Sequence, residues 1–189
     1  MKEKIDLSSS LNSQSGIVRT MLLGEEETVA AVLVEAFDRD PLAQWLYPDR
    51  DRRRSNLHKL FSNILLSPPL GAAIEVTANL DAVAIWLPPN SKLDSEPPDT
   101  ASEAQALFAL IEEATPDIPF WYLAFIGVKT SGTGSGSALM QHRLNIIRGA
   151  IALWTGNEKN LRFYEKFGFK PISEHRVLGV NAWWLTRSI

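Results

Sequence analysis

The sequence has no cysteine, little excess charge and no long apolar run, and each absence excludes a class of protein. Without cysteine there are no disulfides, no cysteine zinc sites and no cysteine nucleophile. The three histidines lie far apart without HxxxH or HxH spacing, so the sequence predicts no metal site. A net charge of -3 argues against a nucleic-acid partner, because general nucleic-acid binders usually have a strong basic excess.

The sequence also shows no membrane-spanning segment and no secretory signal peptide. No apolar run approaches the roughly 20 residues of a membrane span. The first sixteen residues lack the apolar core and the small-residue cleavage pattern of a secretory signal. We therefore expect a cytoplasmic protein that does not act on a membrane.

What is present fits one ordinary globular domain. The chain has 189 residues, of which 45% are hydrophobic and 22% charged, close to an average soluble protein. Residues 1–16 are polar and rich in serine, which predicts a flexible N-terminal tail. Residues 17–189 are expected to form a single domain.

Helix and strand signals are mixed along the chain, which predicts an α/β or α+β architecture. We expect helices at 25–37, at 101–114, directly after the glycines at 132–136, and at 157–168. A further helix is expected before Pro68, with Asp49 or Asp51 as its cap and with helical spacing of its apolar residues Leu57, Leu60, Phe61, Ile64 and Leu65. We expect strands at 17–22, 72–79, 82–87, 119–128, 150–155, 170–178 and 181–187.

Three local patterns carry further expectations. Strand 119–128 is nearly all apolar, which predicts burial on both faces at the centre of the sheet. Thr100 and Glu103 have capping-box spacing at the start of the third helix. The arginine run at 52–54 favours a solvated helix face, with an anion site as the alternative.

The most informative segment is VKTSGTGSGS at 128–137, where a strand meets glycines that open a helix. Gly132, Gly134 and Gly136 let the backbone adopt positive φ and approach a ligand closely. The unpaired amides at the start of a helix favour an anion, most naturally a phosphate or diphosphate. A flexible glycine-serine hinge is the alternative interpretation.

Two common phosphate-binding motifs do not match this segment. A P-loop needs a lysine directly after its last glycine, and none is present. A dinucleotide fingerprint needs GxGxxG and an acidic residue at the end of the next strand, whereas this chain has GxGxG and then Trp154-Thr155-Gly156. A nucleoside triphosphatase and a dinucleotide-dependent oxidoreductase are therefore disfavoured.

A second motif follows at 157–169, a short helix that ends in glycine and enters an aromatic strand. Asn160 and Tyr164 lie four residues apart and share one helical face. A tyrosine that only packs in the core is the alternative interpretation.

In this order and spacing, the motifs resemble those of the GNAT superfamily of acyl-CoA-dependent N-acetyltransferases. The resemblance covers residues 119–187: a YLxxxxV strand (Tyr122, Leu123, Val128), a Q/R-x-x-G-x-G/A loop (Gly134, Gly136) and N-x-x-F/Y-Y-x-x-x-G-F (Asn160 to Phe169). DPLAQWLYP at 40–48 and AIWLPP at 84–89 also resemble the N-terminal half of the puromycin-acetyltransferase-like branch.

The resemblance implies the GNAT fold. This is a twisted, mixed, mostly antiparallel sheet of about seven strands with helices on both faces. The sheet is splayed between its fourth and fifth strands, and acetyl-CoA lies in the cleft.

The resemblance also implies how acetyl-CoA is held, with no metal. Backbone groups of Ile126, Gly127 and Val128 would pair with the pantetheine arm, and Asn160 would contact that arm. The Tyr164 hydroxyl would face the thioester sulfur as the catalytic acid. The loop amides would hold the diphosphate, namely those of Ser131, Gly132, Thr133, Gly134, Ser135, Gly136 and Ser137.

Two departures from the family pattern stand out. Ser131 occupies the position where the family has glutamine or arginine. Strand 119–128 carries no acidic residue, so the general base is a water chain or a carboxylate elsewhere, such as Glu75, Asp38 or Asp40.

The resemblance therefore implies direct transfer of an acetyl group to the primary amine of a small molecule in a ternary complex. The alternative is a non-catalytic acyl-CoA-binding protein of the same fold. A homodimer is also expected from the resemblance, because dimers are common in the family. The acceptor pocket would be formed by the first two helices, their connecting segment 38–48 and loop 88–100. Aromatic candidates for its wall are Trp45, Tyr47, Trp86 and Trp121.

Overall fold

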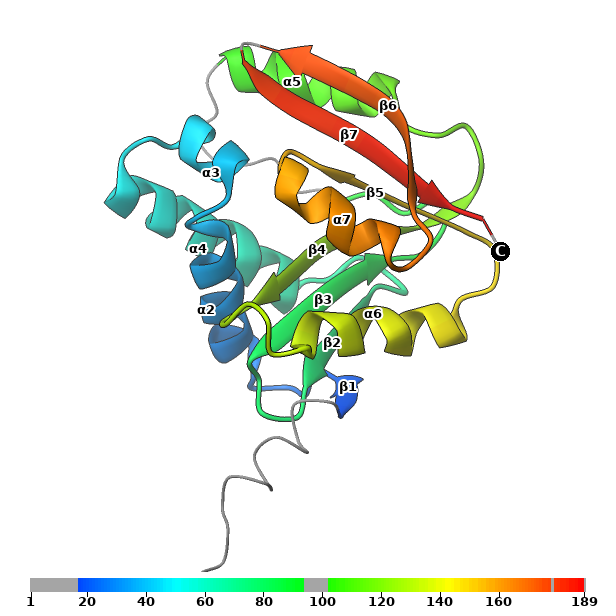
Figure 1. Ribbon diagram of the computed structural model, residues 1–189. Helices are drawn as coiled ribbons and strands as arrows, with labels where there is room; N and C mark the ends of the chain where they lie inside the picture. Colours follow the sequence, from blue (N-terminus) through cyan, green and yellow to red (C-terminus); the bar gives the residue numbers. More distant parts are fainter. Residues whose placement is uncertain (1–16, 94–101, 178, 189) are drawn as a thin grey trace, which may run out of the picture.

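The computed structural model describes residues 17–93, 102–177 and 179–188, which include a seven-stranded sheet (Figure 1). Its strand order is β1-β2-β3-β4-β5-β7-β6, and only the β4–β5 pair is parallel. The strands are β1 (Val18–Thr20), β2 (Ala73–Thr77), β3 (Ala82–Leu87), β4 (Phe120–Val128), β5 (Ala150–Thr155), β6 (Lys170–Val177) and β7 (Val180–Arg187). The predicted mixed, mostly antiparallel sheet is confirmed, while the expected tail at 1–16 and Thr100 lie outside the described residues.

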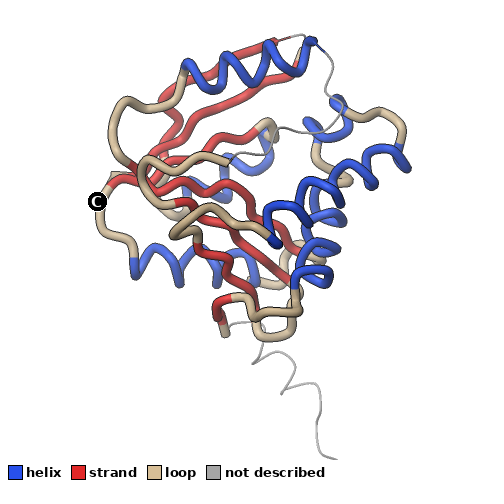
Figure 2. The backbone as a smooth tube through the Cα atoms, turned by 180° about the vertical axis from the view of Figure 1, so that it is seen from behind, coloured by secondary structure: helices blue, strands red, loops and turns tan. Residues whose placement is uncertain are grey.

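Helices cover both faces of the sheet, as Figures 1 and 2 show from opposite sides. One face packs against α2 (Glu26–Phe37), α3 (Pro41–Leu46), α4 (Arg50–Leu66) and α5 (Ser102–Glu113). The other face packs against α6 (Ser135–Ile146) and α7 (Leu161–Glu165), which follows the 3-10 turn η1 (Glu158–Asn160). The predicted helices are confirmed, and α3 is an addition that the sequence patterns did not indicate.

Strand β3, rather than β4, is the strand buried on both faces. All six residues from Ala82 to Leu87 are buried, with Val83 and Ile85 toward α2 and α4 and Trp86 toward α6. In β4 only Leu123 and Gly127 are buried, so the prediction for 119–128 was wrong on this point. The reason is that an open cleft, described below, runs along β4.

Strand β4 contains a β-bulge opposite β3 and pairs with β5 over only part of its length. Ile85 pairs with Phe125 and Trp86 with Leu123, so Ala124 is an extra residue in β4. Such a bulge bends a strand and redirects the side chains beyond it. Strand β4 pairs with β5 only from Phe120 to Tyr122, and the splay expected between the fourth and fifth strands is therefore present.

The corner between α2, α3 and α4 is fixed by a buried carboxylate. Asp38 accepts hydrogen bonds from Arg53 Nε at 3.0 Å, Arg50 Nε at 3.2 Å and Arg54 Nη1 at 3.3 Å. Burial alone would raise the pKa of Asp38, but the arginine hydrogen bonds outweigh it and lower that pKa. Arg53 is itself buried and also donates to the carbonyl of Tyr47 at 2.8 Å, which contradicts the solvated face expected for this residue.

Beneath α6, a buried ion pair offers a test of what stabilises this face of the sheet. Arg143 Nη2 lies 2.6 Å from Glu75 Oε1, and the Arg143 guanidinium stacks over the ring of Trp121 at 5.6 Å. Both charged side chains are almost fully buried. The charge of Glu75 is therefore compensated inside the protein rather than by water.

Replacing Arg143 with leucine should lower the free energy of unfolding by roughly 3–5 kcal/mol, because Glu75 would remain as a buried, poorly compensated charge. The double variant Glu75→Met, Arg143→Leu should recover much of that loss, since it removes both charges. Urea unfolding of the single and double variants measures this. A single variant within 1 kcal/mol of the unmodified protein would contradict the expectation.

Candidate functional site

A cleft of about 850 Å³ lies where β4 and β5 separate. Figure 1 shows the two strands diverging, with α2 and α7 on either side of their open ends. The lining comes from β4, from the α2–α3–α4 corner, from α5 and from the segment between β5 and α7. This volume suits a small molecule or a cofactor arm, since such sites span roughly 300–1,000 Å³.

Several residues singled out from the sequence do come together in this cleft. Ile126, Gly127 and Val128 line it from β4, Ser131 from the segment that follows, and Asn160 and Tyr164 from the opposite side. Because β5 pairs only with the first three residues of β4, the cleft-side edge of β4 from Leu123 onward has no strand beside it among the described residues. A bound extended chain could therefore pair with that edge.

Gly127 has a packing reason to be glycine. A Cβ atom there would lie 3.0 Å from Ala36 Cβ and 3.2 Å from Leu33 Cδ2, closer than such contacts normally come. Helix α2 therefore packs directly against the β4 backbone. That close contact holds α2 beside the cleft.

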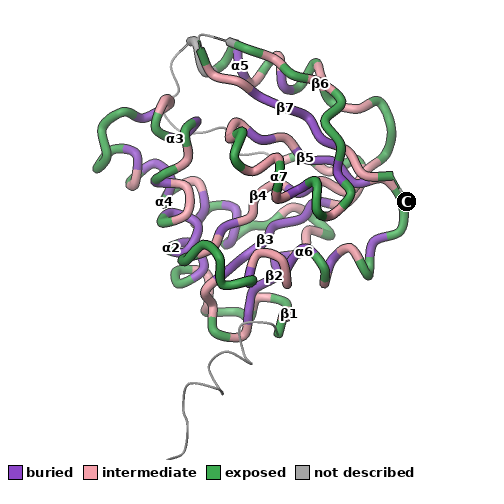
Figure 3. The backbone as a smooth tube through the Cα atoms, in the orientation of Figure 1, coloured by how far each residue is buried: buried purple, intermediate pink, exposed green. Residues whose placement is uncertain are grey.

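The glycine loop lies at the end of the cleft rather than along its wall. Residues 132–137 do not line the cleft, but they continue directly from Ser131, which does. Residues 129–134 are exposed, and the loop is green in Figure 3. Gly132 and Gly134 have φ of +84° and +87°, and a Cβ atom at either would have no neighbour within 4 Å.

Gly134 is also the N-cap of α6, which gives the loop its chemical character. The first amides of a helix have no partner within the helix, and the helix dipole makes this end positive. The loop therefore presents backbone amides in open space at a positive helix end. This arrangement suits an anion, and the anion site predicted from the sequence stays a prediction.

A carboxylate distant in sequence holds this loop in place. Ser135 is buried and donates from Oγ to Asp81 Oδ2 at 3.2 Å, while Thr77 Oγ1 donates to Asp81 Oδ1 at 2.6 Å. Thr133 Oγ1 donates to the carbonyl of Thr130 at 3.1 Å. The loop is thus ordered through the β2–β3 turn, a connection that no local sequence pattern indicated.

Tyr164 lies in a mostly apolar part of the cleft wall. Its ring packs against Phe163 and Phe169, with centroids 5.3 and 6.1 Å apart, and its side chain is almost fully buried. Burial, with a smaller contribution from the charge of Asp40, raises the pKa of Tyr164 well above its usual 10. The hydroxyl therefore stays protonated at neutral pH and can act as a donor.

Of the three carboxylates considered as a base, only Asp40 lines the cleft. Asp38 is paired with arginines, and Glu75 is buried under α6. Asp40 Oδ1 caps α3, accepting from the amides of Leu42 at 2.9 Å and Ala43 at 3.4 Å.

Burial raises the pKa of Asp40, while hydrogen bonds from these amides and from the Asn157 side chain act in the opposite direction. A carboxylate of raised pKa beside a protonated tyrosine is a suitable pair for proton transfer.

The aromatic wall of the cleft differs from the one expected. Of the four candidates, only Tyr47 lines the cleft. Trp86 is fully buried toward α6, Trp121 stacks with Arg143 on that same face, and Trp45 packs against the α5 core. The rings that line the cleft besides Tyr47 and Tyr164 are Phe37, Phe61, Phe108, Tyr122, Phe125 and Trp154.

The described residues contain neither a metal-binding cluster nor a membrane-spanning helix. Within residues 17–93, 102–177 and 179–188, no group of three or more histidine, cysteine, aspartate or glutamate side chains could hold a metal ion. No helix in the described part of the chain is both long enough and apolar enough to cross a membrane.

Comparison with known proteins identifies the fold. No protein-family model and no curated protein sequence matches the chain. A structure named as histone acetyltransferase HPA2 and related acetyltransferase from Corynebacterium glutamicum is 24% identical with a TM-score of 0.71, covering 90% of this chain and 94% of that one.

Two other solved structures are similar over most of their length. The C-terminal condensation domain of Ebony, in complex with beta-alanyl-dopamine, is 11% identical with a TM-score of 0.65, covering 92% of this chain and 98% of that one. A mosquito protein named arylalkylamine N-acetyltransferase like 5b is 16% identical with a TM-score of 0.62, covering 92% of this chain and 99% of that one. The chain therefore has the GNAT fold that its motifs predicted.

Proposed function

We propose that this protein is a GNAT-superfamily N-acetyltransferase that transfers an acetyl group from acetyl-CoA to the primary amine of a small molecule. One observation carries the proposal: a carboxylate and a protonated tyrosine, Asp40 and Tyr164, share a cleft that continues into an anion-binding loop. The fold neighbours that are acetyltransferases support the same chemistry. The segments at 40–48 and 84–89 favour the puromycin-acetyltransferase-like branch.

The residues present fit acetyl-CoA. The open edge of β4 near Ile126 and Val128 suits the amide groups of the pantetheine arm, and Asn160 lines the same cleft. The amides from Gly132 to Ser137 suit the diphosphate. A hydroxyl at Ser131 replaces the longer side chain of the family pattern, so the amides carry more of the diphosphate contact.

The residues around the reacting groups suit direct transfer. Acetyl-CoA supplies the activated acyl group when bound. Asp40 accepts a proton from the incoming ammonium group, and the freed amine attacks the thioester carbonyl carbon. The carbon–sulfur bond breaks, and Tyr164 donates its hydroxyl proton to the departing sulfur. The acylated nitrogen gives its second proton to the Tyr164 oxygen, which restores the hydroxyl, and the proton held by Asp40 passes to water. No covalent bond to the protein forms.

A non-catalytic acyl-CoA-binding protein of the same fold is the second candidate, favoured by Ser131 in the loop. Measuring turnover of acetyl-CoA distinguishes these two candidate functions. Release of free thiol from acetyl-CoA in the presence of primary amines supports the enzyme, and binding without thiol release over a broad amine panel supports the binding protein.

Acetyl-CoA at about 100 times its dissociation constant should raise the free energy of unfolding by roughly 2.7 kcal/mol. Gly134→Ala should abolish most of that stabilisation, because a Cβ atom there enters the open space where the diphosphate would lie. Thermal-shift measurements with acetyl-CoA, ATP and NADH test this. Equal stabilisation by NADH, or none by acetyl-CoA, would contradict the proposed site.

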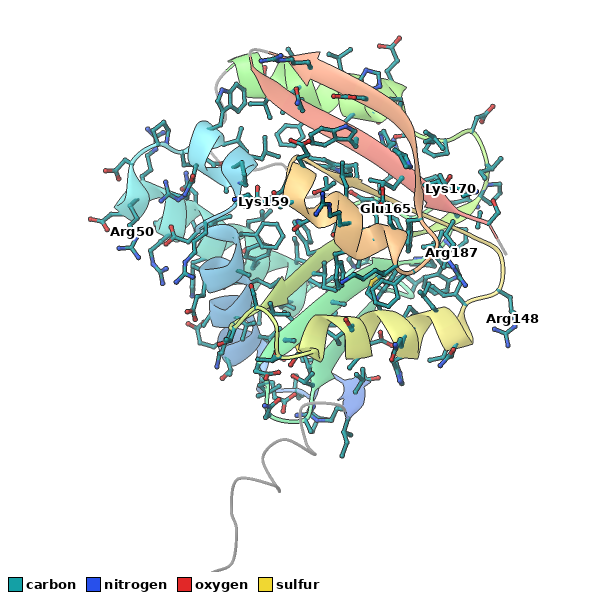
Figure 4. All side chains as sticks on the ribbon, in the orientation of Figure 1. Arg50, Arg148, Lys159, Glu165, Lys170 and Arg187 are labelled. Carbon is teal, nitrogen blue, oxygen red and sulfur yellow. The ribbon has the colours of Figure 1, made fainter. Side chains whose placement is uncertain are left out.

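Gly149→Ala is the matched control for this experiment. Gly149 also has positive φ, +110°, and also has open space around its Cβ position. It follows Arg148, which Figure 4 shows projecting outward at the end of α6 remote from the loop. Both substitutions introduce backbone strain, but only Gly134→Ala should weaken the response to acetyl-CoA.

A further inference from the structure

The acceptor side of the cleft combines one partly buried carboxylate with a continuous aromatic surface. Asp40 lies beside Tyr164, where the amine must react, and Phe108, Tyr122 and Trp154 line the cleft from α5, β4 and β5. We infer that the acceptor is an arylalkylamine, a single ammonium group joined by a short alkyl chain to an aromatic ring. This inference rests on the proposed function and names its substrate class.

The charges around the cleft favour an acceptor with one cationic group. Among the described residues, the charged side chains that line it besides Asp40 are Glu35, Arg39 and Lys129, all of them exposed. Two of these three side chains are positive and one is negative, so together they give a second cation no net attraction. A polyamine is therefore a poor match, whereas a lone ammonium group at Asp40 is well matched.

The aromatic surface presents rings rather than polar atoms. Trp154 packs edge to face with Phe108, with centroids 6.3 Å apart, and its side chain hydrogen-bonds that of Tyr122. Tyr122 is supported from behind by Trp184, with centroids 5.9 Å apart. Because the polar groups of Trp154 and Tyr122 bond each other, the wall offers ring edges and faces, which suit another aromatic ring.

The carboxylate and the apolar wall are also held in one rigid unit. Asp40 is the N-cap of α3, and Leu42 and Leu46 of that helix line the cleft. The hydrogen bond from Arg53 to the carbonyl of Tyr47 fixes the other end of α3. Asp40 and these two leucines are therefore held in fixed positions relative to each other.

The test compares 2-phenylethylamine, butylamine and spermidine as acceptors. We expect kcat/KM for 2-phenylethylamine to exceed the other two by about tenfold or more, since filling an apolar pocket is worth factors of this size. Phe108→Ala should remove most of this preference by raising KM for 2-phenylethylamine. Leu110→Ala, on the same helix and also half-buried but away from the cleft, should keep the preference.

Butylamine or spermidine acetylated as well as 2-phenylethylamine would overturn the inference and leave the proposed function intact. Absence of turnover with every amine would instead overturn the proposed function. In that case, calorimetric binding of 2-phenylethylamine to the protein saturated with coenzyme A still decides the inference. Binding that Phe108→Ala weakens and Leu110→Ala does not supports it, and absence of binding overturns it.

Discussion

Replacing Asp40 with asparagine should lower kcat/KM for amine acetylation by roughly 10²–10³, the size of effect expected when a general base is removed. Asparagine keeps the shape of the side chain and caps helices about as well as aspartate, so α3 should remain in place. Asp40→Ala should lose both the base and the cap. Steady-state kinetics with a thiol-release assay, alongside thermal unfolding of both variants, measures these effects.

The pH profile tests whether Asp40 is the base. Burial raises the pKa of Asp40, and only the ionised carboxylate accepts a proton, so kcat/KM should rise with pH through that raised value. In the described part of the chain, the other titratable side chains that line the cleft are Glu35, Arg39, Tyr47, Tyr122, Lys129 and Tyr164. If Asp40→Asn keeps the same acidic limb and most of its activity, one of these groups or water is the base.

Tyr164→Phe should lower kcat by roughly 100-fold while the dissociation constant of acetyl-CoA changes little, because only the proton donated to the departing sulfur is removed. The phenyl ring retains its packing against Phe163 and Phe169. Calorimetry with acetyl-CoA and thermal unfolding provide the controls. A kcat within threefold of the unmodified protein would assign Tyr164 a packing role only.

These two substitutions should not be additive. The charge of Asp40 contributes to the raised pKa of Tyr164, so the two groups influence each other. When two groups act as a unit in catalysis, removing either one commonly lowers the rate about as much as removing both. The double variant Asp40→Asn, Tyr164→Phe should therefore be little worse than Asp40→Asn alone, measured in the same assay.

Features of the fold that depend on neighbours in sequence could be predicted well. The apolar spacing of Leu57, Phe61 and Ile64 predicted α4, and Asp49, one of two proposed caps, does cap it. The positive φ at Gly132 and Gly134 follows from the glycine pattern. Helix α3 was missed because it is short, although an aspartate cap followed by Pro41 is a recognised start signal.

Features that depend on burial or on distant partners were predicted less well. Arg53 is buried because Asp38, on another helix, accepts its hydrogen bond. Strand β4 reads as fully apolar, yet most of it is only half-buried because it borders the cleft. Composition alone cannot show which apolar side chains face a core and which face a ligand site.

The sequence by itself determined the mixed architecture, the glycine loop at the start of α6 and the pairing of Asn160 with Tyr164 on one side of a short helix. Each depends on residues a few positions apart, where backbone geometry sets the contact. The tertiary structure alone decided that Asp40, rather than Glu75 or Asp38, lies beside Tyr164. That choice depends on tertiary packing, because α3 and α7 are far apart in the sequence and contribute to the same cleft only in the folded chain.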